Sequence, residues 1–248
     1  MYQKLKNQKS KPSSQLPNFF QIVIRHFIKM TSLPNGYIIR DADEKDTMQI
    51  AEILKYYIQK TLATWAEGEA EEPTAESMLA KYRDFRRPAS SSHLAPYPWL
   101  VIIDENENET RYEKSSKSES ESVHENSSRI IGFAYAGPFR ARAGWRFTCE
   151  DSIYLRPGYE RRGLGKVLLS TLITRCKSLG YRKMVAVISV DGSGEGGKYA
   201  CNDGLGLASV NLHKSLGFVE AGLFTNAGEK FNRIMDSLFL TLDIQEKV

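Results

Sequence analysis

Apolar and polar positions alternate and cluster along the chain in a way that predicts strands and helices from about Tyr37 onwards. Short apolar runs bounded by polar residues predict buried strands at 99–103, 130–136 and 184–189. Apolar residues spaced three and four apart predict amphipathic helices, most clearly at 166–179, where Gly180 provides the C-terminal stop. The other expected elements are a strand at 37–40, helices following 41–46 and Pro73, a short helix at 208–216, and strands at about 219–224 and 233–242. Helices alternate with strands while hairpins also occur, so we expect an α/β (α+β) fold with a mixed, mostly antiparallel twisted sheet flanked by helices.

Two segments depart from this pattern, and the first is the N-terminus. No acidic residue precedes Asp41, whereas lysines and an amphipathic patch at 19–28 are present. We therefore expect residues 1–36 to form a disordered basic extension. A mitochondrial transit peptide, which is also basic and poor in acidic residues, is an alternative. Translation starting at Met30 is another, because the folded pattern begins just after it.

The second segment is the stretch 104–128, which consists mainly of Glu, Ser, Asn and Lys with almost no apolar residue. Such a composition buries too little surface to order itself. It lies between two predicted strands, so we expect a hairpin with an enlarged loop. The insert interrupts a domain at 37–244 without dividing it.

Composition sets further limits on the function. With 248 residues and 41% hydrophobic content, the chain is long enough for one sizeable core. A net charge of +4 is too small to argue for nucleic acid. No apolar run approaches the roughly 20 residues that cross a bilayer, so no membrane partner is expected. Cys149, Cys176 and Cys201 lack the spacing of a metal site and read as free thiols. We expect a soluble cytoplasmic protein that binds no metal.

The turn Glu160–Gly165, E-R-R-G-L-G, is the most informative local feature. It follows a strand end at 152–155 and precedes the helix that begins near Lys166. This order offers backbone N–H groups and a positive helix dipole to a phosphate. The turn lacks the Lys-Ser/Thr of a Walker A loop and the spacing of G-x-G-x-x-G. It resembles the R/Q-x-x-G-x-G/A turn of the GNAT acyltransferase superfamily, which cradles the pyrophosphate of acetyl-CoA. A tight turn before a helix uses glycines in any case, and this remains the alternative.

Four segments in the same order sharpen this resemblance towards the phosphinothricin and methionine sulfoximine acetyltransferases. They are 133–142 (their Y-A-G-P-W/F-x-x-R), 148–155 (T-x-E-x-S/T-V-Y-V), 184–188 (V-V-A-V-I) and 209–218 (S-V-x-x-H-x-x-L-G-F). The resemblance covers about Tyr37 to Ile244. It implies one domain with the GNAT fold, acetyl-CoA as acyl donor, and acetylation of the α-amine of a small amino acid or analogue by direct attack. Relatives tend to be dimers, so a homodimer is possible.

The resemblance also implies roles for individual residues. Glu150 would be the base that takes the ammonium proton, and a solvated charge at a strand edge is the alternative. His213, four residues before Gly217, would protonate the leaving thiolate; a helix-surface or core histidine is the alternative. The implied cofactor-binding residues are Ile153, Tyr154, Leu155, Arg161, Arg162, Gly163, Leu164, Gly165, Lys166 and Asn202.

Acceptor binding is the less determined part. Arg140 or Arg142 could hold an amino-acid carboxylate in a bidentate pair, although either could be a solvated turn arginine. Trp65 and Phe139 could line the acceptor pocket, although aromatic residues are more often plain core.

The chain departs from the family pattern in three places. Glu160 occupies a Gln or Arg position, the loop 191–207 carries an insertion, and Ile234-Met235-Asp236 replaces a frequent Trp-His-Asp. Two rival functions therefore stay open. One is a GNAT enzyme acting on another amine, such as a polyamine or a peptide N-terminus. The other is a CoA-binding module without catalysis.

Overall fold

The computed structural model describes residues 33–34, 36–87, 96–106, 129–191 and 204–245. All of these belong to one compact unit, Leu33–Val248. Most of the predicted N-terminal extension, residues 107–128 of the polar insert and Asn202 lie outside the described residues.

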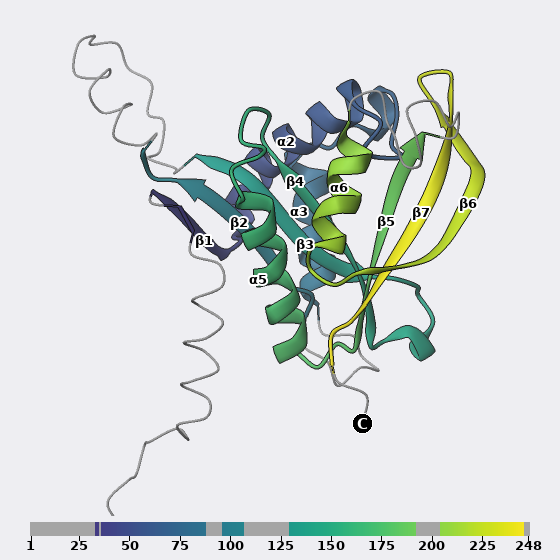
Figure 1. Cartoon of the computed structure of the whole chain (residues 1–248). Coiled ribbons are helices and arrows are strands. Elements are labelled where there is room, and N and C mark those ends of the chain that lie inside the picture. The colour runs from purple at the N-terminus through teal and green to yellow at the C-terminus, as the bar shows by residue number, and fades with distance from the viewer. Residues whose placement is uncertain (1–32, 35, 88–95, 107–128, 192–203, 246–248) are drawn as a thin grey trace, which may run out of the picture. The chain divides into compact units, whose positions relative to one another are not determined.

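A seven-stranded sheet forms the centre, in the order β1-β2-β3-β4-β5-β7-β6 (Figure 1). Its strands are β1 Tyr37–Asp41, β2 Trp99–Asp104, β3 Ile130–Pro138, β4 Thr148–Leu155, β5 Lys183–Asp191, β6 Val219–Lys230 and β7 Arg233–Asp243. Neighbouring strands are antiparallel except for β4 and β5, which run parallel. The predicted mixed, mostly antiparallel sheet is confirmed.

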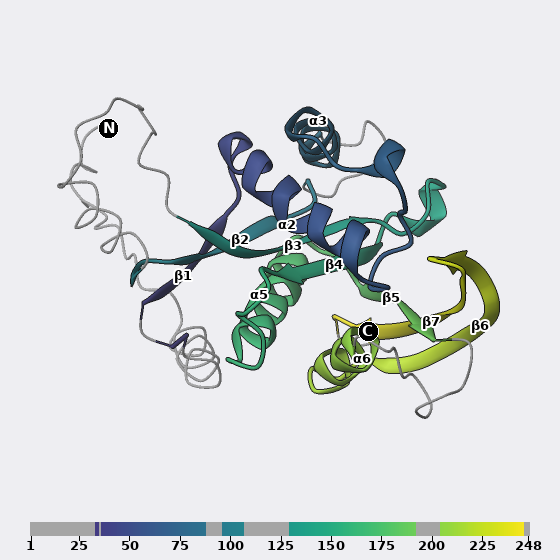
Figure 2. The same ribbon diagram turned by 90° about the horizontal axis from the view of Figure 1, so that it is seen from above.

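Helices cover both faces of the sheet (Figure 2). On one face lie α2 Thr47–Lys60 and α3 Ala75–Arg86, and on the other lie α5 Leu164–Ser178 and α6 Leu205–Lys214. Thr74 caps α3 by accepting a hydrogen bond from the Ser77 N–H, as its sequence predicts. Three short 3₁₀ turns complete the described part: η1 Glu44–Asp46, η2 Glu69–Glu71 and η3 Ala143–Trp145.

Each face of the sheet has its own hydrophobic core. Leu168 and Leu172 of α5 pack with Ala186 of β5 on one face. Ile53 of α2 packs with Phe133 of β3 on the other. Because β3 is covered on both sides, it reads as a continuous apolar run and not as an alternating one.

Strands β4 and β5 pair over only a short distance. The parallel pairing joins Thr148 to Lys183, Cys149 to Met184 and Glu150 to Val185. Strand β4 meanwhile stays paired with β3 as far as Leu155. Beyond Glu150 the strands β4 and β5 therefore diverge, and the divergence opens the middle of the sheet.

Several element boundaries differ from the predictions; strand β6, for example, runs to Lys230, beyond its expected end near 224. Helix α5 begins at Leu164, two residues earlier than expected, because the left-handed Gly163 (φ 78°) already acts as its N-cap. Helix α6 begins at Leu205, inside the predicted Gly-rich loop, because Gly204 (φ 69°) does the same there. Asp104, expected to open the insert, is the last residue of β2 and is buried.

Candidate active site

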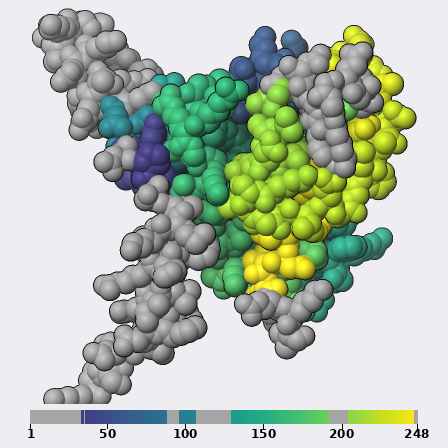
Figure 3. Space-filling model, viewed as in Figure 1, coloured from purple at the N-terminus to yellow at the C-terminus, as the bar shows by residue number. Residues whose placement is uncertain are grey.

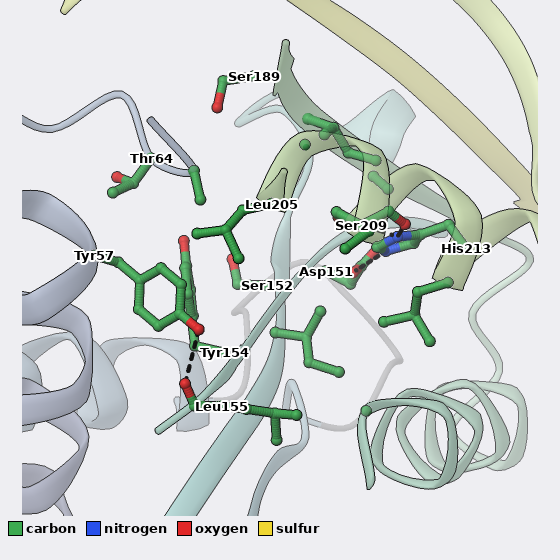
Figure 4. Close-up of a pocket in the computed structure, with 18 of the residues that line it drawn as sticks. Tyr57, Thr64, Asp151, Ser152, Tyr154, Leu155, Ser189, Leu205, Ser209 and His213 are labelled. Atoms are coloured by element: carbon green, nitrogen blue, oxygen red, sulfur yellow. Dashed lines mark hydrogen bonds and ion pairs between the residues drawn. The ribbon is translucent and has the colours of Figure 1, made fainter. Parts of the chain in front are cut away.

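A cavity of about 620 Å³ fills the opening between the diverging strands. Its walls come from the second half of β4, the start of α5, strand β5, helix α6 and the loop that follows α2. Figure 3 shows the surface hollowed between the green atoms of β4 and α5 and the yellow-green atoms of α6. Figure 4 shows the side chains that face one another across it.

The start of α5 forms one end of the cavity. No side chain caps this helix, and the first N–H groups of a helix have no partner within it. Arg161 and Lys166 add two cations to the wall beside Gly163 and Gly165. A Cβ on Gly165 would touch Leu212 at 3.5 Å and Leu155 at 3.7 Å, so glycine keeps the wall open here. Free N–H groups, a positive helix end and two cations fit the pyrophosphate of acetyl-CoA.

Most of the predicted cofactor-binding residues line this cavity, namely Ile153, Tyr154, Leu155, Arg161, Gly163, Gly165 and Lys166. Leu164 does not, because its side chain is fully buried in the core. Arg162 is directed away: its guanidinium donates to the Tyr37 hydroxyl at 3.2 Å and to the Gly158 carbonyl at 2.8 Å.

Glu160, which occupies a Gln or Arg position of the family turn, lies on the cavity wall. One of its carboxylate oxygens accepts a hydrogen bond from the Gly158 N–H at 2.8 Å. The negative charge is thus partly neutralised within its own turn, and the departure is compatible with phosphate binding by backbone groups.

Glu150 lies where the pairing between β4 and β5 ends, and it lines the cavity. Burial raises the pKa of its carboxyl group, and the charge of Asp151 raises it further, while Arg140 and Lys81 act in the opposite direction. The Phe85 ring packs against the β3 neighbour of Glu150, since a Cβ on Gly137 would meet the ring at 2.6 Å. A carboxylate with a raised pKa in a cavity is a candidate general base.

His213 lines the same cavity from α6 and is buried. Its Nε2 lies 3.0 Å from Asp151 Oδ2, and its Nδ1 lies 2.7 Å from the Ser209 carbonyl oxygen. Burial alone would lower the pKa of the imidazole, but the Asp151 carboxylate and the Ser209 carbonyl outweigh it, and the pKa is raised above 6.5. Figure 4 shows the ring beside Asp151.

The predicted acceptor-binding residues are not brought together. Trp65 lines the main cavity, and Gly228 lets it approach β6, since a Cβ there would meet the indole ring at 2.9 Å. Phe139 and Arg140 line a second cavity of about 590 Å³ against β5, β6 and β7, and the guanidinium stacks over the Phe139 ring at 4.2 Å. Arg142 is exposed and lines neither cavity.

The segment that replaces Trp-His-Asp has a mainly structural setting. Met235 is buried against Leu62, whereas Ile234 is 56% exposed. Asp236 accepts a hydrogen bond from the Asn226 N–H at 2.8 Å.

The sequence reasoning missed Lys81 and Asp151. Lys81 donates to the Tyr135 hydroxyl at 2.6 Å and acts electrostatically on Glu150 from α3. No sequence pattern near Lys81 links it to Glu150. Asp151 had a usable signal, because it neighbours Glu150 on a predicted strand and its side chain therefore had to face the opposite side of the sheet.

Within the described ranges, no three His, Cys, Asp or Glu side chains are grouped as a metal site would require. Among the helices that the structure describes, none is both long and apolar enough to span a bilayer.

Comparison with known proteins places these features in a family. The chain matches the acetyltransferase (GNAT) family over residues 80–195. It is 30% identical over 208 residues to the L-methionine sulfoximine/L-methionine sulfone acetyltransferase of Salmonella typhimurium, covering 84% of this chain and 95% of that protein. It is 36% identical over 118 residues to the phosphinothricin N-acetyltransferase of Alcaligenes faecalis, a match that covers 48% of this chain and only 53% of that protein.

Two solved structures are similar as a whole. A Salmonella typhimurium protein holding its cofactor acetyl-CoA has a TM-score of 0.64 and 29% identity, with 86% of this chain and 96% of that one covered. A phosphinothricin acetyltransferase from Sinorhizobium meliloti in complex with acetyl-CoA has a TM-score of 0.62 and 31% identity, with 84% and 88% covered. The predicted resemblance and fold are confirmed, and the cavity beside the start of α5 is consistent with a donor site. The chain belongs to the GNAT family of acetyl-CoA-dependent N-acetyltransferases.

Proposed function

We propose that the chain transfers an acetyl group from acetyl-CoA to the α-amine of a small amino acid or amino-acid analogue, by direct attack of the amine. The observation that carries this proposal is the setting of Glu150. Its carboxyl group has a raised pKa, lines the cavity and lies in the field of two cations, Arg140 and Lys81. Such a site suits an acceptor that carries a basic amine and a carboxylate close together.

Glu150 is the proposed base for the incoming ammonium group. The ammonium group of an amino acid is a weaker acid than an ordinary carboxylic acid, so a carboxylate with a raised pKa is a better match to it than an ordinary one. When bound, acetyl-CoA supplies the acetyl thioester. The ammonium group loses two protons on its way to the amide. Glu150 takes one of them and releases it to solvent. The other makes up for the proton that a group of the protein delivers to the thiolate sulfur.

His213 is the proposed source of the sulfur's proton. It lines the cavity from α6, while Glu150 and Asp151, neighbours on β4, point to opposite faces of the sheet. The proton acceptor and the proton donor would thus act from different sides of β4, so that neither neutralises the other directly.

Charge around Glu150 also bears on the class of acceptor. An α-amino acid places its carboxylate two bonds from the amine nitrogen, so a cation near the base can pair with it. A polyamine would instead bring a second positive charge towards Arg140 and Lys81. This arrangement favours a free amino acid over a polyamine, and a peptide N-terminus, which has no carboxylate at that position, gains nothing from it.

The test incubates the purified protein with acetyl-CoA and a panel of acceptors and follows thiol release. The panel includes free amino acids, phosphinothricin, methionine sulfoximine, a polyamine and a short peptide. We expect turnover with amino-acid acceptors that Glu150→Gln abolishes while acetyl-CoA binding persists. Turnover confined to the polyamine or the peptide would overturn the proposed acceptor. Tight binding of acetyl-CoA with no turnover on any amine would favour a non-catalytic module.

We further propose a homodimer. Strand β6 is an edge of the sheet, and it exposes Val219, Leu223 and Phe224, the last of these by 63%. Exposed apolar residues on an edge strand are an association surface. Light scattering on the purified chain measures the mass directly, and a monomer at micromolar concentration would contradict the proposal.

A further inference from the structure

Two polar side chains meet inside the protein below the α6 wall of the cavity. The side chains of Asp151 and His213 are each 2% exposed, and Asp151 Oδ2 lies 3.0 Å from His213 Nε2. Both residues line the cavity, and Figure 4 shows them next to each other. A contact between two buried ionisable groups constrains where their protons reside.

The hydrogen-bond partners of the imidazole ring indicate which of its nitrogens carry a proton. Nδ1 faces the carbonyl oxygen of Ser209 at 2.7 Å and the Ser209 hydroxyl oxygen at 3.4 Å, and because the nearer carbonyl only accepts, a hydrogen on Nδ1 fits this contact. Nε2 faces a carboxylate oxygen, which when ionised also only accepts. With Asp151 ionised, an imidazolium that donates from both nitrogens satisfies both contacts and balances the buried carboxylate.

The surroundings of the second carboxylate oxygen of Asp151 make a positive charge on His213 more important. Asp151 Oδ1 is buried and has no hydrogen-bond partner within the described part of the chain. A buried carboxylate that lacks part of its hydrogen bonds depends on a paired cation for its stability. His213 is the group that can supply that positive charge.

Among the described residues, Asp151 is the charged group that acts on the imidazole. From its own helix the ring meets the Ser209 carbonyl, and from the segment after α6 it meets Phe218, whose ring packs edge-on at 4.9 Å. From β4 it meets Asp151, the charged group that acts on its pKa and raises it despite burial.

We propose that Asp151 is a positioning residue for the transfer reaction, which fixes the orientation of His213 through Nε2 and keeps its ring doubly protonated at neutral pH. The transfer of this proton to a thiolate sulfur rests on the proposed function. The ring holds a proton next to the cavity until a thiolate sulfur, as the C–S bond breaks, competes with Asp151 for the proton on Nε2. The proton that the amine loses as the C–N bond forms then restores the imidazolium.

The test reads the protonation state directly, by ¹⁵N NMR of histidine-labelled full-length protein over a range of pH. The chain has four histidines, and the signal of His213 is assigned as the one lost in His213→Gln. We expect nitrogen shifts of an imidazolium at pH 7 and a titration midpoint above the ordinary value of about 6.5. In Asp151→Asn the midpoint should fall by about one unit or more, since the paired charge is gone.

Asp191, the last residue of β5, provides a matched control. Asp191 also has a side chain that is 2% exposed and is paired with a cation, Arg233, at 2.7 Å. Asp191→Asn removes an equally buried carboxylate and should leave the His213 midpoint unchanged. A similar fall in both variants would show a general loss of packing and would overturn the role of Asp151.

Activity gives an independent second measurement. In Asp151→Asn the alkaline limit of kcat should move to lower pH together with the NMR midpoint, leaving about a tenth of the wild-type kcat at pH 8. KM for acetyl-CoA should change little, because the turn at α5 is untouched. A wild-type ring that is neutral at pH 7 overturns the inference whether or not amino acids are acetylated. An imidazolium in a protein that acetylates no amino acid overturns the proposed acceptor alone.

Discussion

The two ends of the cavity differ in how they are built. The proposed phosphate end consists of one continuous segment, in which the end of a strand, a turn and the start of α5 follow one another from Ile153 to Lys166. The other end is lined by Trp65 after α2 and Glu150 on β4, and Lys81 on α3 and Arg140 after β3 act on Glu150 electrostatically without lining the cavity. The first end depends on local geometry and the second on how distant segments pack. Each can therefore be disrupted without the other, and the variants below do so.

The largest expected effect is at the acceptor end. Replacing Glu150 by Gln removes the proposed base but keeps the shape of the side chain. We expect kcat to fall about 10²- to 10⁴-fold, the range that a general base usually contributes. Acetyl-CoA affinity, measured by calorimetry, should change less than about threefold, because the phosphate end is local. Loss of both together would show that the two ends are not independent.

Arg140 and Arg142 should behave differently although they are two residues apart. Arg140 acts on Glu150, whereas Arg142 lines neither cavity. In Arg140→Ala we expect KM for the amino acid to rise about tenfold or more, since a hydrogen bond to a charged group contributes roughly 1.5–3 kcal/mol. Arg142→Ala is the matched control and should change KM less than about threefold.

The same Arg140 variant has a pH signature. Arg140 lowers the pKa of Glu150, so its removal should raise that pKa further. The acid limit of kcat/KM should therefore move to higher pH in Arg140→Ala and stay in place in Arg142→Ala. A shift to lower pH would contradict the assignment of Glu150 as the base.

The phosphate end is tested by Gly163→Ala. Gly163 has a φ of 78°, and a Cβ there would meet nothing within 4 Å, so the substitution strains the backbone without a clash. A left-handed non-glycine residue costs roughly 1–2 kcal/mol. We expect about a tenfold loss of acetyl-CoA affinity, which corresponds to 1.4 kcal/mol, with KM for the amino acid unchanged.

Gly144→Ala provides the control for that variant. Gly144 also has open space around its Cβ position but no positive φ, and it lies in η3, away from α5. It should leave both affinities unchanged. Equal effects in the two variants would mean that the left-handed turn is not what matters.

The smallest expected effect concerns stability. The folded-state pKa of Glu150 is raised above 4.5, so folding favours its neutral form. The stability that this provides is complete below about pH 4.5 and is lost as the pH rises through the raised pKa. At pH 7.5 the ionised carboxylate therefore costs stability, and Glu150→Gln should raise Tm slightly. At pH 4 the difference should disappear, and a variant that is less stable at both pH values would contradict this reasoning.

The contrast between the two ends also explains what could be read from the sequence. The strands, the helix at α5 and the glycine turn were predictable because their apolar spacing and turn residues act within a few positions. The buried run of β3 was visible for the same reason. Helix α6 was placed too late, because Gly204 was taken as part of a loop when it is in fact the left-handed residue that starts the helix.

The acceptor end could be predicted only in part. The resemblance proposed Glu150 and His213 as site residues, yet the pairing of His213 with Asp151 joins residues 62 positions apart in the chain. Lys81 comes near Glu150 only because α3 packs on β3, where Gly137 admits the Phe85 ring. Arg140 and Arg142 are alike in sequence, and their different surroundings follow from the path of the turn after β3. Such contacts depend on tertiary packing, which local patterns do not encode.

The short pairing between β4 and β5 has a mechanical consequence. The sheet consists of two ribbons of paired strands, one formed by β1 to β4 and the other by β5, β7 and β6. The two ribbons are joined by three residue pairs between β4 and β5, whereas the strands β5 and β7 within one ribbon share nine. A donor molecule lying in the opening would touch both ribbons and tie them together. Amide hydrogens of 151–155 and 186–191 should then exchange with solvent faster in the free enzyme than in the loaded one. The acyl donor would be a structural brace as well as a reactant, and each release of CoA would briefly loosen the sheet at its centre.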